Sequence, residues 1–207
     1  MLNRRLVLPI AVLVSACVSD APAPGTDADA DTASAPVVAD SSPAASVSPS
    51  GADSLRVTAD GWEPLRIGMT RAEVVAAAGD DANPNAVGGP EPESCDEFRP
   101  ARAPAGMLVM IERDTLARIS VSRNTGITTP DGLRVGDSAA VVLRTVGARA
   151  EVVPHKYEAA PARYITVWAK APDAKLRRGI LYEIDGSDKV RAIRVGGPSI
   201  QYVEGCL

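Results

Sequence analysis

Residues that could carry catalytic chemistry are scarce in this 207-residue chain, which has one histidine, His155, and three cysteines. A lone histidine occurs with serines and aspartates in many sequences, so it does not by itself indicate a Ser-His-Asp triad. The sequence of residues 153–156 favours a loop after a helix, so we expect His155 to lie on the surface. No spacing of Cys, His and carboxylates is typical of a metal site. We therefore expect a protein that is not an enzyme, with no catalytic residue, cofactor or metal.

Two charged clusters are further candidates for chemistry. An acidic run could perform acid–base catalysis or bind a cation, but we interpret it as a solvated loop. Its members are Glu91, Glu93, Asp96 and Glu97. A basic spot could bind phosphate or glycan anions, but we interpret it as a charged hairpin tip. Its members are Lys175, Arg177 and Arg178.

The first cysteine follows a targeting segment. Residues 1–16 contain two arginines and then a short apolar run, which is too short to span a bilayer and predicts a signal peptide. Residues 14–17, VSAC, resemble the lipobox of bacterial lipoproteins. The resemblance implies cleavage before Cys17 and acylation of that cysteine, and Val18 in place of Asp favours sorting to the outer membrane.

Residues 18–53 form an expected linker. They are almost wholly Ala, Ser, Asp, Pro, Thr, Gly and Val, and cannot bury enough apolar surface to fold. The six linker aspartates, against two arginines in the signal peptide, account for the formal net charge of −4 and leave residues 54–207 neutral. A neutral domain provides no basic footprint for nucleic acid. The expected partners are the membrane, through the lipid anchor at Cys17, and an envelope protein.

Cys95 and Cys206 predict a disulfide. Acylation removes Cys17 from the count, and an exported domain enters an oxidising compartment, where two free thiols seldom persist. The bond would close a loop of more than a hundred residues, and the chain-entropy estimate of its stabilisation is about 4–5 kcal/mol, less any strain. A nucleophilic role for Cys95 is disfavoured because its neighbours are acidic.

An internal repeat predicts the helices and strands that must position the candidate residues named above. Residues 65–79, LRIGMTRAEVVAAAG, recur without a gap as residues 133–147, LRVGDSAAVVLRTVG. We interpret each copy as a strand end, a glycine turn, a short helix and a glycine stop. Thr70 and Glu73 predict a complete capping box in the first copy, whereas Ser138 predicts only half of one in the second. Helices this short are marginal alone, so each must pack on a sheet.

The sequence after each repeat predicts an antiparallel meander. Turn residues at positions 113–115 and 185–188 indicate two hairpins. The expected strands are residues 54–58, 95–99, 107–112, 116–122, 164–170, 179–184 and 189–195. The fold class is therefore expected to be α+β, with two tandem modules, each a short helix followed by an antiparallel β-meander. The expected boundaries of the modules are residues 54–125 and 126–207.

The helix motif G-M-T-x-x-x-V-x-x-x-x-G at residues 68–79 resembles the small outer-membrane lipoproteins of the SmpA/OmlA (BamE) family. It equally resembles the β-lactamase inhibitor protein family, in which two such modules stand in tandem. The second copy departs from the motif, with Asp137 in place of the methionine. Both families are binding proteins, so the resemblance implies helices on antiparallel sheets and recognition through exposed sheet or loop surface. No contact residue carries over.

Tyr164, Thr166 and Trp168 form the candidate binding face. They alternate along one strand with Ile165 and Val167, whose branched side chains suit a core, so we expect Tyr164 and Trp168 to be partly exposed. The expected function is an outer-membrane lipoprotein with a periplasmic protein-binding domain, in envelope assembly or in inhibition of a hydrolase. The alternative is a carrier of a small envelope ligand, or an envelope enzyme, that uses this face or a cleft between the modules.

Overall fold

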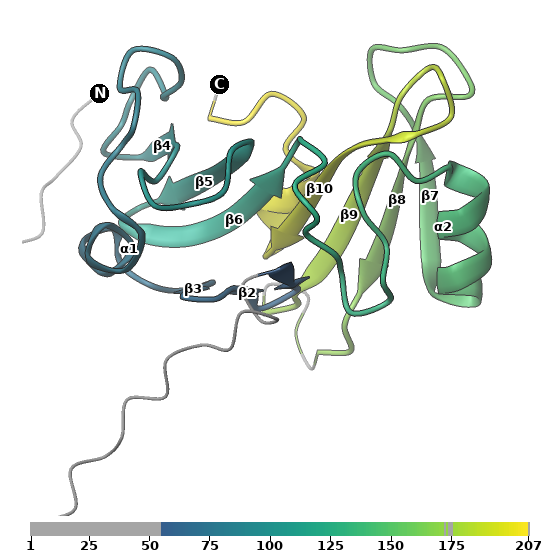
Figure 1. Cartoon of the computed structure of the whole chain (residues 1–207), viewed down its shortest axis with the longest axis horizontal. Coiled ribbons are helices and arrows are strands. Elements are labelled where there is room, and N and C mark those ends of the chain that lie inside the picture. Colours follow the sequence, from purple (N-terminus) through teal and green to yellow (C-terminus); the bar gives the residue numbers. More distant parts are fainter. Residues whose placement is uncertain (1–54, 172, 174–175, 207) are drawn as a thin grey trace, which may run out of the picture. The chain divides into compact units, whose positions relative to one another are not determined.

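A seven-stranded antiparallel sheet dominates the computed structural model, which describes residues 55–171, 173 and 176–206 (Figure 1). The strand order is β4-β5-β6-β10-β9-β8-β7. The strands are β4 (Cys95–Phe98), β5 (Met107–Glu112), β6 (Thr115–Val121), β7 (Ala150–Pro154), β8 (Arg163–Trp168), β9 (Gly179–Ile184) and β10 (Val190–Gly196). The expected signal peptide, Cys17 and the linker of residues 18–53 lie outside the described residues.

Two groups of consecutive strands share this sheet. Strands β4 to β6 form one end and β7 to β10 the other, and they join where β6 pairs with β10. In that pairing Ile193 lies opposite Val121, and Gly196 lies opposite Arg118. The fold is therefore mixed α and β, with mostly antiparallel sheets. All described residues belong to one compact unit, Ser46–Leu207.

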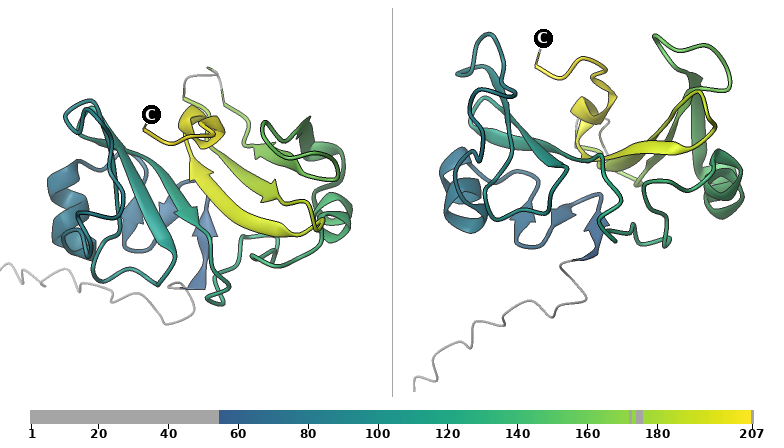
Figure 2. Two further views of the ribbon diagram at one scale, coloured as in Figure 1. Left: turned by 90° about the horizontal axis from the view of Figure 1, so that it is seen from above. Right: turned by 45° about the horizontal axis from the view of Figure 1, so that its top comes forward.

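A short helix precedes each group of strands, α1 (Arg71–Ala78) and α2 (Ala139–Val146). Both helices lie on the same face of the sheet (Figure 2), where Val74 and Val142 are wholly buried in one apolar core. A small sheet of β1 (Val57–Thr58), β2 (Gly61–Trp62) and β3 (Leu65–Arg66) contributes to the same core. Among the described residues, no helix is long and apolar enough to cross a membrane.

The predicted helix caps are present. The hydroxyl of Thr70 accepts from the N–H of Glu73 at 3.3 Å, and the Glu73 carboxylate accepts from the N–H of Thr70 at 2.7 Å, which completes the capping box. The backbone hydrogen bond from Thr70 is the main reason that the pKa of Glu73 is lowered. The hydroxyl of Ser138 accepts from the N–H of Val141 at 3.3 Å, which is the expected half cap.

The two predicted hairpin turns are also present. Arg113 and Asp114 connect β5 to β6 with φ values of 46° and 62°, the double positive φ of a type I′ turn. Asp185 organises the turn between β9 and β10, because one of its oxygens accepts from the N–H groups of Ser187 at 2.9 Å and Lys189 at 3.1 Å.

Two segments differ from the prediction. Residues 153–154, expected in a loop, belong to the edge strand β7, which pairs with β8. Their assignment is obscured by Pro154, because proline within a short apolar run argues against a strand. The hydrophobic residues 200–203, IQYV, could add an edge strand by their sequence, but residues 200 and 201 lie in the 3-10 helix η3 (Pro198–Gln201), and residues 202 and 203 follow it outside any strand. Its first residue is a proline, whose fixed φ suits the start of a helical turn.

The caps give a testable difference between the two helices. We expect Thr70→Ala to lower the free energy of unfolding by about 1 kcal/mol, and by more than Ser138→Ala, because only the first cap is a reciprocal pair. Urea denaturation of the full chain at pH 7 measures both. Glu73→Gln is the control, since glutamine retains the capping box. A larger loss from Ser138→Ala would contradict this reading of the caps.

Candidate functional site

The C-terminal residues 197–206, called the strap below, lie on the sheet face opposite the two helices (Figure 2). The strap contains η3, and its Ile200 is wholly buried. Ile200 packs against Tyr164 of β8 and Leu181 of β9 in a second, smaller apolar cluster. The strap is therefore an integral layer of the domain, and it decides which parts of this sheet face remain exposed.

Two arginines of the sheet hold the strap by its backbone. Arg118 of β6 donates from Nη1 to the carbonyl oxygens of Ser199, at 3.2 Å, and Tyr202, at 3.0 Å. Arg194 of β10 donates from Nη1 to the same Tyr202 oxygen, at 2.9 Å. The backbone at Tyr202 is thus fixed by two cations from neighbouring strands. Charge-assisted hydrogen bonds of this kind are stronger than neutral ones.

Each of these arginines also forms a buried ion pair. Arg118 pairs with Glu97, and Arg194 pairs with Glu183, and no side chain of the four is more than 12% exposed. Burial is the main cause that lowers the pKa of Arg118, while the charge of Glu97 acts in the opposite direction. Removing one member of such a pair leaves an uncompensated buried charge. The strap and the ion pairs therefore stabilise each other.

The predicted disulfide closes the end of the strap. Cys95, the first residue of β4, is bonded to Cys206, with the two Cα atoms 5.4 Å apart and a sequence separation of 111. Next to it, Gly205 has a φ of 70°, and a Cβ atom there would lie 2.1 Å from Oε2 of Glu97. Glycine is thus required for the strap to pass over the buried carboxylate.

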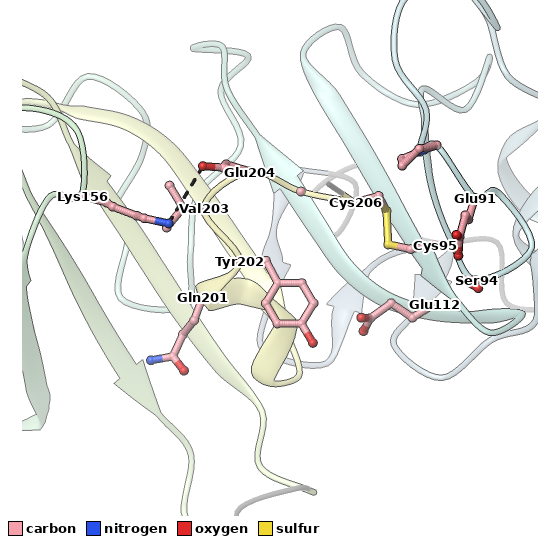
Figure 3. Close-up of a pocket in the computed structure, with 12 residues that line it drawn as sticks. Glu91, Ser94, Cys95, Glu112, Lys156, Gln201, Tyr202, Val203, Glu204 and Cys206 are labelled. Atoms are coloured by element: carbon pink, nitrogen blue, oxygen red, sulfur yellow. Dashed lines mark ion pairs between the residues drawn. A yellow bond between two sulfur atoms is a disulfide. The ribbon is translucent and has the colours of Figure 1, made fainter.

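Tyr202 projects from this fixed backbone and is 47% exposed. Figure 3 shows its ring extending toward Glu112 of β5. The negative charge of Glu112 is the main cause that raises the pKa of the Tyr202 phenol, with burial and a hydrogen bond to the same carboxylate adding to it. The phenol is therefore neutral at physiological pH, and its one O–H is directed to the Glu112 carboxylate.

Two hollows are lined by Tyr202, and Glu112 also contributes to both. The first, of about 650 Å³, extends along the strap to Cys206 and to the surface pair Lys156 and Glu204, whose charged atoms are 3.9 Å apart (Figure 3). The second, of about 560 Å³, extends toward Arg178. The strap thus presents one aromatic side chain with space for partner groups around it.

His155, expected on the surface, is buried, and that prediction is wrong. The residue is only 9% exposed, and its ring stacks on Tyr164 with 4.7 Å between centroids. Nδ1 accepts from the N–H groups of Tyr157 at 3.2 Å and Glu158 at 3.1 Å, while Nε2 lies 3.5 Å from Oε1 of Glu183. Because both ring nitrogens are engaged, the histidine has no free lone pair with which to act as a general base.

Glu183 is the centre of this buried cluster. It pairs with Arg191 and Arg194 and approaches His155. Burial raises the pKa of Glu183, but the charge of Arg194 and the hydrogen bonds from Arg191 outweigh it, so the net pKa is lowered. Arg191 also pairs with Glu158, at 2.5 Å. Glu183 therefore links His155, which follows β7, to Arg194, which holds the strap.

The predicted binding face is largely covered. Tyr164 is 6% exposed and Thr166 is 3% exposed. Trp168 stays partly exposed, with the guanidinium of Arg177 3.9 Å from its ring centroid, and it donates from Nε1 to Oε2 of Glu151 at 2.8 Å. The exposure expected for Tyr164 is wrong, because the strap packs on that side of the strand.

The acidic run is not a uniform solvated loop. Glu91 and Glu93 are exposed as expected, but Asp96 and Glu97 lie in β4. Asp96 is 8% exposed and lies 2.6 Å from Nη1 of Arg71. The expectation of a solvated loop is therefore wrong for these two carboxylates, because partners distant in sequence neutralise them. Among the described residues, no group of His, Cys, Asp and Glu could hold a metal ion.

The basic spot is only partly described. Lys175 lies outside the described residues. Arg177 covers the ring of Trp168, and Arg178 lines the second hollow. These two guanidinium groups thus have different surroundings, and the structure does not present them as one anion site.

Sequence reasoning missed Arg118, Arg194 and Tyr202. A signal for the two arginines was available, since each interrupts an apolar strand, in TLARISV and VRAIRVG. Arginine is almost never fully buried without a partner, so a position within such a strand indicates a buried ion pair. Nothing in the sequence around Tyr202 distinguishes it from the other tyrosines.

No protein-family model matches the sequence, and a search of curated proteins finds no match. Among solved structures, the chain is similar to the crystal structure of a DUF4309 family protein, YjgB, from Bacillus subtilis. The two are 14% identical, and the similarity covers 66% of this chain and 84% of that one, with a TM-score of 0.41. A likeness this weak supports no argument about function.

The buried cluster predicts a specific pH dependence. Glu183 has a lowered pKa in the folded state, so its contribution is complete above its ordinary value of 4.5 and is lost as pH falls through the folded pKa. We expect Glu183→Gln to lower the free energy of unfolding at pH 7 by roughly 3 kcal/mol, because the buried guanidinium of Arg194 loses its counter-charge, whereas Arg191 keeps its pair with Glu158. The deficit should shrink at pH 3, because the carboxylate of the unfolded chain, with its ordinary pKa of 4.5, is then protonated and the ion pairs lose part of their stabilising effect.

Urea unfolding of the full chain and the variant at pH 7, 5 and 3 measures this effect. Glu63→Gln is the matched control, because Glu63 pairs with Arg66 on the surface, with side chains 37% and 67% exposed. Its loss should stay below about 1 kcal/mol. A deficit for Glu183→Gln that is constant from pH 7 to pH 3 would refute the assignment.

Proposed function

We propose that this chain is an outer-membrane lipoprotein whose periplasmic domain binds a protein partner, with Tyr202 as the central contact. One observation carries the binding role: Tyr202 is 47% exposed although its carbonyl is held by Arg118 and Arg194. Tyrosine is enriched among the residues that dominate binding energy at protein interfaces. A contact whose backbone is already fixed avoids much of the ordering cost of association.

The surroundings of Tyr202 favour a protein over a small ligand. Small-molecule sites are mostly apolar cavities that enclose most of the ligand. The first hollow is instead lined by many polar groups, including Glu91, Glu112, Lys156 and Glu204. An exposed aromatic side chain with a polar surround matches the centre and rim of a protein interface.

We infer that the two halves of the domain, residues 54–125 and 126–207, are copies of one module. The order of elements supports this inference, because α1 precedes β4 to β6 and α2 precedes β7 to β10. The N-cap residues of the two helices, Thr70 and Ser138, occupy equivalent positions in the repeat. The pairing of β6 with β10 then joins two modules into one sheet, in an arrangement like that implied by the resemblance to the β-lactamase inhibitor protein family.

The proposed location rests on the sequence. The lipobox at residues 14–17 would place a lipid anchor at Cys17, and residues 18–53 would tether the domain to the membrane. Several acyl chains on one residue suffice for stable attachment where one chain does not. The disulfide between Cys95 and Cys206 is in keeping with an oxidising compartment.

The anchor is tested by substituting its cysteine. We expect Cys17→Ser to move the chain from the membrane fraction to the soluble periplasmic fraction, because the acylation site is lost. Cell fractionation and immunoblotting measure the distribution. Ser19→Ala, just outside the lipobox, is the control and should remain with the membrane. Retention of Cys17→Ser in the membrane fraction would show that the anchor is elsewhere.

The contact at Tyr202 is tested by photocrosslinking. We expect a photoreactive phenylalanine derivative at position 202 to yield a discrete adduct with one protein in intact cells, and the same group at Tyr157 to yield none. Tyr157 is the matched control because it is 59% exposed and lines neither hollow.

Once the crosslinked protein is identified, its affinity for the purified chain decides the question. Tyr202→Ala should weaken binding by at least about 30-fold, the effect of losing a hot-spot residue of about 2 kcal/mol. Tyr157→Ala should change it by less than about twofold. Equal adducts at both positions, or an affinity unchanged by Tyr202→Ala, would refute the proposed contact.

A further inference from the structure

We infer that the free edge of β7 binds an extended segment of a protein partner as an additional strand of the sheet. β7 (Ala150–Pro154) is the last strand at its end of the sheet, and within the described part of the chain it pairs only with β8. Val152 and Val153 are each 47% exposed. This surface is distinct from Tyr202, and the inference goes beyond the contact proposed above.

The register shows which backbone groups face outward. The N–H of His155 donates to the carbonyl of Ala162 at 3.2 Å. In an antiparallel pair, hydrogen-bonded positions alternate with non-bonded ones. The bond of His155 to Ala162, just before β8, therefore sets the alternation, and positions 153 and 151 face β8, whereas Ala150, Val152 and Pro154 direct their backbone groups away from it.

The outward groups are mostly acceptors. The N–H of Ala150 is already used, because it donates to the carbonyl of Gly147. Pro154 has no N–H. The edge consequently presents the carbonyl oxygens of Ala150, Val152 and Pro154 but only one donor, the N–H of Val152. In the described part of the chain, no hydrogen bond involves any of these four groups.

This imbalance disfavours pairing of β7 with the β7 strand of a second copy of the chain. Two β7 strands related by a twofold axis at Val152 would place Ala150 opposite Pro154, and neither residue has a free N–H, because that of Ala150 donates to Gly147 and Pro154 has none. Such a pair forms two hydrogen bonds, both at Val152. A different strand with N–H groups at three alternate positions forms four. Proline and charge at an edge are known devices against self-association, and here they leave the edge open to a donor strand.

The side chains define the chemistry of the partner segment. Val152 lies opposite Ile165, which belongs to the helix-side core, and Val153 lies opposite Tyr164 on the strap side. Glu151 shares the side of Val153. Cross-strand pairs favour aliphatic residues opposite valines and a basic residue opposite a glutamate. The partner segment is therefore extended, with two adjacent aliphatic residues followed by lysine or arginine, and no proline at the three donor positions.

A synthetic peptide of this pattern provides the test. The probe is acetylated and amidated STVVKTS, whose second valine pairs with Val152 in the antiparallel register and whose lysine lies opposite Glu151. It is titrated into the isotope-labelled full chain, with the Val152 amide followed by NMR and by hydrogen exchange. We expect a saturable shift and slowed exchange at Val152. The control is the same peptide N-methylated at the second valine, which cannot donate there.

Two variants distinguish the proposed backbone contact from non-specific peptide binding. Val152→Pro removes the sole donor without breaking a bond to β8, and we expect it to weaken peptide binding about threefold to tenfold, the effect of one net hydrogen bond. Glu151→Lys should weaken binding of STVVKTS and restore it for STVVETS. If the melting temperature shows that Val152→Pro does not fold, the charge reversal with Glu151→Lys tests the peptide site instead.

The inference is overturned if Val152 exchange is unchanged at millimolar peptide, if the N-methylated peptide binds equally, or if Glu151→Lys does not reverse the charge preference. Tyr202→Ala should leave peptide binding unchanged. A negative result at β7 thus leaves the strap contact standing, and a failure of the strap contact leaves this one standing.

Discussion

The paired donation of Arg118 and Arg194 to the carbonyl oxygen of Tyr202 is the interaction on which this face of the domain depends. A buried guanidinium is costly unless its charge is paired and its N–H groups are satisfied. Glu97 and Glu183 supply the charges, but they engage only part of each guanidinium. Backbone carbonyls of the strap accept from Nη1 of each arginine, although Nε of Arg118 stays buried without a hydrogen-bond partner. The strap therefore satisfies polar groups of the arginines while they hold it in place.

The disulfide acts on the same constraint from the other end. A cross-link over 111 residues removes much of the conformational entropy of the unfolded chain. It also keeps the strap close to Arg118 and Arg194, which donate to its carbonyl oxygens. Ile200 adds an apolar contact at the middle of the strap. Three different interactions therefore fix a ten-residue segment that has little regular structure beyond η3. This is why Tyr202 can be both exposed and well positioned.

The features predictable from the sequence are those with local causes. The capping box of Thr70 and Glu73 lies within four residues, and the hairpin turns at Asp114 and Asp185 are set by their own side chains and backbone. The disulfide is predictable from the number of cysteines left after Cys17 and from the oxidising compartment that the signal peptide predicts. The burial of His155 depends on Glu183, 28 residues further along the chain, and no local pattern reports such a partner. The burial of Tyr164 also has a distant cause, since Ile200 packs against it.

The two ends of the sheet illustrate the same difference between local and distant causes. At the β4 end, the N–H of Ala82 donates to the carbonyl of Arg99 at 2.8 Å, and a Cβ atom on Gly89 would lie 2.1 Å from the carbonyl oxygen of Cys95. That edge is covered by its own preceding loop. At the β7 end, proline removes a donor that a covering strand of the same sequence would need. The β7 edge pairs poorly with another β7 strand but keeps free carbonyl acceptors, so it remains suited to an extended segment of a different protein.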